Sequence, residues 1–274
     1  MHTILVLTDF SDTAFHAAEY ASFLAKYYKT QQLLLLNSFF LNPTALANEP
    51  VIAMGIPDLE KESNQLLSDW KQKLSIITGE GTTINTLTSN LPLDEVVEQA
   101  GKEEDVQMAV MGMKGKSNLE KVLIGSTAIR TINSINYPLL LIPSEAPITI
   151  PQTVVIGIDL PIFRQMDKTA LLNILDLLQA RVLLINIAKN DRYAMELKEE
   201  IVALHDIFDK YNAEFHYVTD SDIPGTINKF AQEEKADMII TIHRKNNSII
   251  PLFQKSTTKR LAWNTKVPLL VLPL

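Results

Sequence analysis

Three glycines and two hydroxyl residues in the first half of the chain have a spacing suited to holding a phosphate group. They follow the pattern G-x2-G-x9-G-S-T and comprise Gly112, Gly115, Gly125, Ser126 and Thr127. Glycine permits positive φ angles and lets backbone amides come close to an anion. If the hydroxyl pair opens a helix, its free amides and its dipole also favour phosphate. Lys114 or Lys116 can add positive charge at the rim of this loop.

The same glycines also have a structural explanation, as turns and a helix end. That explanation is weakened because four of the nine glycines lie between residues 101 and 125. The tripeptide Gly-Lys-Ser at 115–117 resembles the end of a P-loop, but Val110 occupies the position of that motif's first glycine. No G-x-G-x-x-G fingerprint follows the first apolar run either. We therefore expect a phosphate loop that is neither a P-loop nor a dinucleotide turn.

A carboxylate at the end of the first apolar run is the second candidate for ligand contact. Asp9 follows Thr8 directly and can accept hydrogen bonds from a ribose or a base. Taken alone, a capping or turn role explains Asp9 equally well. Ser38 stands at the corresponding point after the second apolar run. These side chains matter for binding only if the fold places them beside the glycine loop.

The elements that would position them alternate between short apolar runs and helical patterns. Strands are expected in the first half near 3–8, 32–38, 82–88, 107–112 and 138–142, and in the second near 153–158, 181–187, 214–218, 237–242 and 268–272. Alanines at helical spacing from Ala14 to Ala25 predict a first helix, which Ser11 or Asp12 can cap. Further helices are expected at 58–78 and just after Pro92, with a loop over 39–57. This alternation predicts an α/β fold, with parallel sheets covered by helices on both faces.

A strand order of 3-2-1-4-5 would make the first and fourth strands neighbours. Ligands of open α/β sheets bind outside the carboxyl ends of the strands at such a switch point. Asp9 would then face the loop that starts at Gly112, and Ser38 would lie beside them.

The chain repeats itself, which predicts two tandem domains. Three segments recur in the same order: 3–9 as 153–159, 33–38 as 182–187, and 137–143 as 267–273. We expect domains at 1–143 and 153–274, joined by a linker at 144–152. The second copy has lost the glycines of the loop, because Ile242, Lys245 and Lys255 replace them. We therefore expect no nucleotide there, and we expect His243 beside this degenerate site to be a surface residue.

The segment Thr8-Asp9-Phe10-Ser11-Asp12-Thr13-Ala14, taken with the glycine motif, resembles the ATP-binding branch of the universal stress protein family. The resemblance covers both halves and implies flavodoxin-like (adenine nucleotide alpha hydrolase-like) five-stranded domains that pair through their last strands. It also implies ATP accompanied by Mg²⁺ or Mn²⁺ through the phosphates. The nucleotide-binding residues that it implies are Thr8, Asp9, Ser38, Met111, Gly112, Gly115, Lys116, Gly125, Ser126 and Thr127.

The composition narrows the class of protein. A net charge of -7 argues against a large DNA-binding surface, and the absence of cysteine removes disulfides and thiolate zinc sites. No signal segment and no run of about 20 apolar residues is present, so a cytoplasmic protein without membrane contact is expected. No histidine pair has metal-binding spacing, and no general base is aimed at the loop.

We therefore expect a regulatory stress-response protein that binds ATP in its first domain as a marker of state. Its last strands would pair the two copies within the chain, and two chains would dimerise further. Two alternatives remain open. One is a slow ATPase or nucleotidyl-transfer enzyme, and the other is an interaction scaffold without a ligand.

Overall fold

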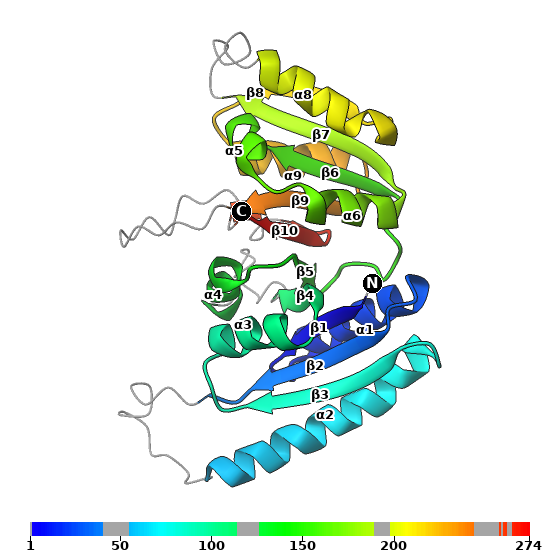
Figure 1. Ribbon diagram of the computed structural model, residues 1–274, viewed down its shortest axis with the longest axis vertical. Helices are drawn as coiled ribbons and strands as arrows, with labels where there is room; N and C mark the ends of the chain where they lie inside the picture. Colours follow the sequence, from blue (N-terminus) through cyan, green and yellow to red (C-terminus); the bar gives the residue numbers. More distant parts are fainter. Residues whose placement is uncertain are drawn as a thin grey trace. The chain divides into compact units, whose positions relative to one another are not determined.

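The computed structural model describes residues 2–40, 55–113, 126–188, 198–243 and 265–274, together with Thr258, Arg260 and Leu261. These residues form two compact units, and the boundary falls between Ser144 and Glu145. Residues 144–152 contain no helix or strand. Each unit is a parallel sheet covered by helices, as predicted (Figure 1).

Unit 1 contains a five-stranded parallel sheet in the predicted order, β3-β2-β1-β4-β5. Its strands are β1 (Thr3–Thr8), β2 (Gln32–Ser38), β3 (Thr83–Ser89), β4 (Val106–Met113) and β5 (Leu139–Pro143). The central strands are nearly continuous apolar runs because helices cover both of their faces. Ile4, Leu5 and Val6 of β1 are completely buried. The sequence patterns therefore located every strand of this unit to within about two residues.

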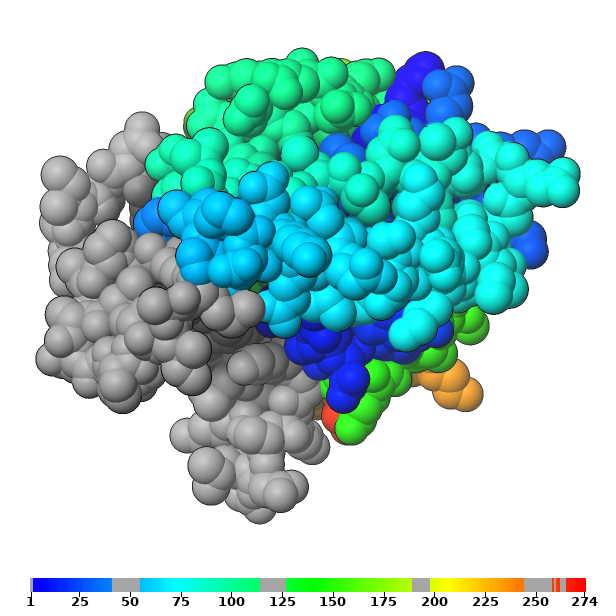
Figure 2. Space-filling view, turned by 90° about the horizontal axis from the view of Figure 1, so that it is seen from below, coloured from blue at the N-terminus to red at the C-terminus, as the bar shows by residue number. Residues whose placement is uncertain are grey.

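The helices of unit 1 are α1 (Asp12–Tyr27), α2 (Ile56–Thr78), α3 (Leu93–Glu103) and α4 (Ser126–Ser134). The predicted alanine face of α1 is buried, and Ser11 caps the helix by accepting a 3.2 Å hydrogen bond from the Ala14 amide. The long helix α2 runs along the surface of the unit (Figure 2). It begins at Ile56, two residues earlier than expected, because Pro57 is tolerated in a first turn. The loop expected over 39–57 is thus shorter, and its residues 41–54 lie outside the described residues.

Unit 2 repeats the same sheet, in the order β8-β7-β6-β9-β10. Its strands are β6 (Thr153–Ile158), β7 (Arg181–Ala188), β8 (Glu214–Thr219), β9 (Met238–His243) and β10 (Leu269–Pro273). Its helices are α5 (Leu160–Gln165), α6 (Thr169–Leu178), α8 (Lys198–Phe208), the short 3₁₀ helix η2 (Asp209–Tyr211) and α9 (Ile223–Glu233). Numbering the strands within the unit gives 3-2-1-4-5 again, which confirms the predicted duplication.

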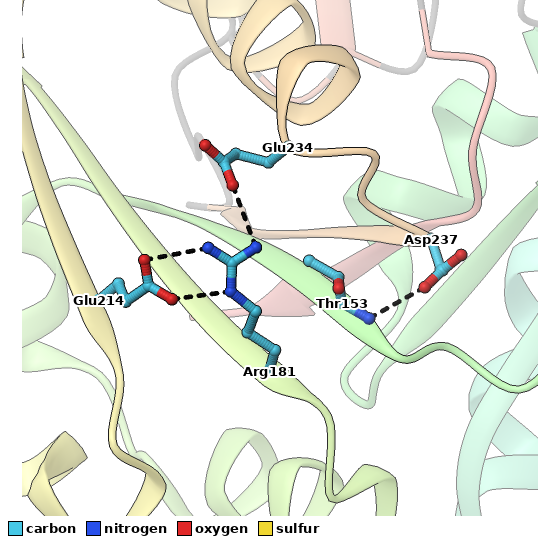
Figure 3. A network of polar contacts seen from close by, with 5 residues as sticks. All are labelled: Thr153, Arg181, Glu214, Glu234 and Asp237. Carbon is cyan, nitrogen blue, oxygen red and sulfur yellow. Dashed lines mark hydrogen bonds and ion pairs between the residues drawn. The ribbon is translucent and has the colours of Figure 1, made fainter.

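A charged network ties together the amino-terminal ends of the strands in unit 2 (Figure 3). Arg181 opens β7 and donates to both oxygens of Glu214, at 2.7 and 3.0 Å, and to Glu234 at 3.1 Å. Asp237 accepts hydrogen bonds from the backbone amides of Gln152 and Thr153, both at 2.9 Å. The hydrogen bond from Arg181 holds the pKa of Glu214 below its ordinary value. This network lies at the opposite end of the strands from the predicted ligand edge, so its role is structural.

Candidate functional site

The carboxyl ends of β1, β2 and β4 form one edge of unit 1. In the sheet register, Leu7 lies opposite Met111 and Thr8 lies opposite Asn37. Five residues predicted for the site therefore lie at or just beyond this edge: Thr8, Asp9, Ser38, Met111 and Gly112. β1 and β4 are hydrogen-bonded neighbours although two strands lie between them in the sequence, so this edge is the topological switch point.

The loop from β1 to α1 has an unusual backbone at Phe10. Its φ angle is 62°, in the left-handed region that costs a non-glycine residue roughly 1–2 kcal/mol. Two short hydrogen bonds fold the loop: the Phe10 amide donates to Thr8 Oγ1 at 2.9 Å, and the Ser11 amide donates to Asp9 Oδ1 at 3.0 Å. Asp9 itself is exposed, so the loop presents its carboxylate at the sheet edge.

Aromatic packing holds this strained loop in place. The Phe10 ring meets Trp70 of α2 edge-on, with 5.6 Å between ring centroids. Phe15 of α1 meets the same indole at 4.9 Å. Trp70 is only 7% exposed, so burial of these rings offsets the strain at Phe10. Trp70 thus belongs to the core of unit 1 and also supports the loop that carries Asp9.

A buried asparagine, which sequence reasoning missed, fastens the ends of two strands to α2. Asn37 Nδ2 donates to the Thr8 carbonyl at 2.8 Å, and Asn37 Oδ1 accepts from Ser63 Oγ of α2 at 2.8 Å. The neighbouring Ser38 donates its hydroxyl proton to the Leu91 carbonyl at 2.7 Å, so toward a ligand it presents only lone pairs. The repeat held a signal for this residue, because Asn186 occupies the equivalent position and donates to the Ile158 carbonyl at 2.9 Å.

Gly112 has a packing reason to be glycine in addition to any phosphate role. A Cβ atom there would lie 2.5 Å from the Thr13 carbonyl oxygen and 2.9 Å from Thr13 Cγ2. Real Cβ atoms do not approach backbone so closely, so glycine lets the start of α1 pack against β4.

The rest of the predicted loop is described only at its end. Gly115, Lys116 and Gly125 lie outside the described residues, as do Lys245 and Lys255 of the second copy. α4 begins at Ser126, as predicted, and Thr127 in its first turn is exposed. The free backbone amides of that first turn are suited to an anion.

The described residues form neither a metal-binding cluster nor a membrane-spanning helix. Within the described ranges, no three His, Cys, Asp or Glu side chains are grouped so that they could hold a metal ion. None of the described helices combines the length and the apolar character that crossing a bilayer requires.

The corresponding edge of unit 2 has different chemistry. Asp159 is retained, and its Oδ1 accepts a 3.3 Å hydrogen bond from the Ile162 amide as it caps α5. Ile242 stands where unit 1 has Gly112. His243 is 5% exposed, so the expectation of a surface histidine was wrong. It is the last residue of β9 and is paired in the sheet with Pro273 of β10, so it belongs to the strand and not to the loop after it.

Comparison with known proteins gives one consistent family. The sequence profile of the universal stress protein family matches residues 1–143 and 167–273. Two universal stress proteins of Methanocaldococcus jannaschii are 27% identical over 152 residues and 29% identical over 143 residues. Each match covers 51% of this chain, and they cover 93% and 80% of the respective relatives. A crystal structure of a universal stress protein from Archaeoglobus fulgidus covers 99% of this chain and 98% of its own, with a TM-score of 0.74 at 17% identity, which shows a common fold.

Proposed function

Because the chain belongs to the universal stress protein family, we propose that unit 1 binds ATP as a regulatory ligand. The observation that carries the proposal is the pairing of β1 with β4, which brings Asp9 and Gly112 to one switch point. This is the edge at which open α/β sheets bind their ligands. The loop that follows Gly112 has the glycine spacing suited to phosphate.

The residues of this edge fit an adenine nucleotide. Asp9 Oδ1 accepts one hydrogen bond, from Ser11, and among the described residues Oδ2 has no partner. That oxygen can accept from a ribose hydroxyl or the adenine amine. Ser38 offers an acceptor beside it, since its proton is already donated to Leu91. The first turn of α4, in which Thr127 is exposed, and the preceding glycines would hold the phosphates, where a bound Mg²⁺ or Mn²⁺ would neutralise charge.

We propose a regulatory rather than a metabolic role for the bound nucleotide. In this proposal the open oxygen of Asp9 contacts the nucleoside and not the phosphates, so Asp9 is not assigned to activating water. The setting would be the cytoplasm. The two units would pair through β5 and β10, apolar strands that Pro138 and Pro268 precede, and two chains would pair further.

Nucleotide retention tests the proposal directly. The full chain is purified and denatured, and any released nucleotide is identified, after which calorimetry measures the binding of added ATP with magnesium. Asp9→Asn keeps an acceptor for Ser11 but removes the second carboxylate oxygen. This substitution is expected to weaken ATP binding by roughly 10- to 100-fold, which corresponds to the loss of one hydrogen bond to a charged group. Gly115→Val is expected to abolish binding.

The duplicated chain supplies a matched control. Asp159→Asn makes the same change at the equivalent position of unit 2 and should leave ATP affinity unchanged. Equal losses in the two variants would contradict binding by unit 1 alone. Absence of both retained nucleotide and binding heat would overturn the proposal, and phosphate release over many turnovers would assign an ATPase instead.

A further inference from the structure

A cavity of about 110 Å³ opens at the carboxyl ends of β6, β7 and β9 in unit 2. It lies at the edge that corresponds to the proposed nucleotide site of unit 1, because Gly157 pairs with Thr241 just as Leu7 pairs with Met111. Seven isoleucines line it, from the three strands and from α5 and α9. Such a lining is suited to an apolar ligand and unsuited to phosphate.

The apolar character arises from replacements at the ligand edge itself. Three positions that are polar or glycine in unit 1 carry isoleucine in unit 2. The replacements are Thr8 by Ile158, Ser38 by Ile187 and Gly112 by Ile242. All three isoleucines line the cavity. The second edge has therefore exchanged the chemistry of a nucleotide site for that of an apolar pocket, and it has kept a hollow there.

The cavity also has a polar side chain in its lining, Asn186 of β7. Asn186 is 7% exposed, and its Nδ2 donates to the Ile158 carbonyl. In unit 1 the equivalent Oδ1 of Asn37 accepts from Ser63. Asn186 Oδ1 has no donor among the described residues, although the side chain lines the cavity. This oxygen is therefore an open acceptor at the cavity, to which a ligand's N–H or O–H group can donate.

We propose that this cavity binds a small neutral molecule with an apolar body and one hydrogen-bond donor, which Asn186 Oδ1 accepts. The volume limits the body to about one ring, since an apolar cavity of about 150 Å³ in another protein holds benzene. The carboxylate of Asp159 at the cavity disfavours anions. The proposal is independent of nucleotide binding by unit 1, because every lining residue belongs to unit 2.

Two matched probes test both parts of this description. Phenol and toluene have similar shapes, but only phenol has a donor. Each is titrated into the isotope-labelled full chain, and the backbone amide signals of Gly157 and Thr241 are followed by NMR. We expect phenol to shift these signals and to bind at least as tightly as toluene, while the signals of Asp9 and Gly112 stay in place. Binding of toluene alone would overturn the donor requirement, and binding of neither would overturn the site.

Filling the cavity provides the variant test. Ile162 on α5 and Ile223 on α9 line it and are partly exposed, so each can be enlarged from the side of the solvent. Ile162→Trp and Ile223→Trp should each weaken phenol binding by roughly tenfold or more, because the indole would occupy the space that phenol needs. Val202→Trp is the control, since Val202 is 53% exposed on α8 and outside the cavity lining. Unchanged phenol affinity in both filled variants, with native thermal unfolding, would contradict the proposal. If both fail to fold, the comparison of phenol with toluene in the wild type decides.

Discussion

The ring of Phe10 meets the indole of Trp70 edge-on, with 5.6 Å between their centroids, while the Phe10 backbone has a φ of 62°. The loop that carries Asp9 is thus held in a costly conformation by a side chain of α2, a helix that follows it by some 45 residues. Strained backbone persists only where surrounding packing over-determines it. Trp70 is therefore a positioning residue for the candidate site.

Removing the indole should destabilise unit 1 strongly. Trp70→Ala deletes a side chain that is 7% exposed and contacts both Phe10 and Phe15, so we expect a loss of about 3–5 kcal/mol in the free energy of unfolding. Urea unfolding of the full chain, followed by circular dichroism, measures it. Ile76→Ala on the same helix is the control, because Ile76 is 82% exposed and should change stability by less than about 0.5 kcal/mol. Equal effects of the two variants would contradict the assigned role of Trp70.

Gly112→Ala should destabilise the protein in the absence of any nucleotide. The added Cβ would meet the Thr13 carbonyl oxygen at 2.5 Å, and overpacking of this kind costs about 1–3 kcal/mol. Gly81→Ala is the matched control, since a Cβ at Gly81 meets nothing within 4 Å. Thermal unfolding without nucleotide separates the two roles of Gly112. A variant as stable as wild type that still loses ATP would assign Gly112 to phosphate binding alone.

The strands, their order and the buried face of α1 were predictable because they depend on local signals. Apolar runs indicate buried strands, the alanine spacing indicates a helix, and the duplication supports both. The switch point and its edge residues followed from that order. The left-handed backbone at Phe10 was not predictable, because the contact that compensates for it comes from α2. The periodicity of α2 predicts a buried face, but it does not predict which loop Trp70 contacts.

Asn37 and His243 both show where prediction from the local sequence fails. An asparagine within an apolar strand gives no periodic signal, although its recurrence as Asn186 marked it. His243 was expected at the surface, after the end of a strand at 237–242. β9 instead extends through His243 and pairs it with Pro273, and its side chain is buried. Both outcomes depend on tertiary contacts, which override the local preference of a residue type.

Acid should weaken unit 2 through the Arg181 network. The hydrogen bond from Arg181 lowers the pKa of Glu214 in the folded state. A depressed folded pKa contributes stability above the unfolded pKa, and that contribution is lost as the pH falls through the folded value. The urea midpoint should therefore fall as the pH drops below the ordinary glutamate value of about 4.3. Arg181→Met should flatten this acid dependence. Lys102→Met, which removes an exposed pair with Glu98, should leave the slope as in wild type.

Asn37 should contribute more to the stability of unit 1 than Asn186 contributes to the stability of unit 2. The Asn37 side chain makes two hydrogen bonds, whereas the Asn186 side chain makes one. Asn37→Leu leaves the Thr8 carbonyl and the Ser63 hydroxyl without their partner, at a cost of about 1–3 kcal/mol for each buried group. Asn186→Leu leaves only the Ile158 carbonyl, so its loss in the free energy of unfolding should be smaller. Adding Ser63→Ala to Asn37→Leu should cost less than Ser63→Ala alone, since the hydroxyl then has no bond left to lose. Strict additivity in urea unfolding of the four chains of this cycle would show that Ser63 and Asn37 are not coupled.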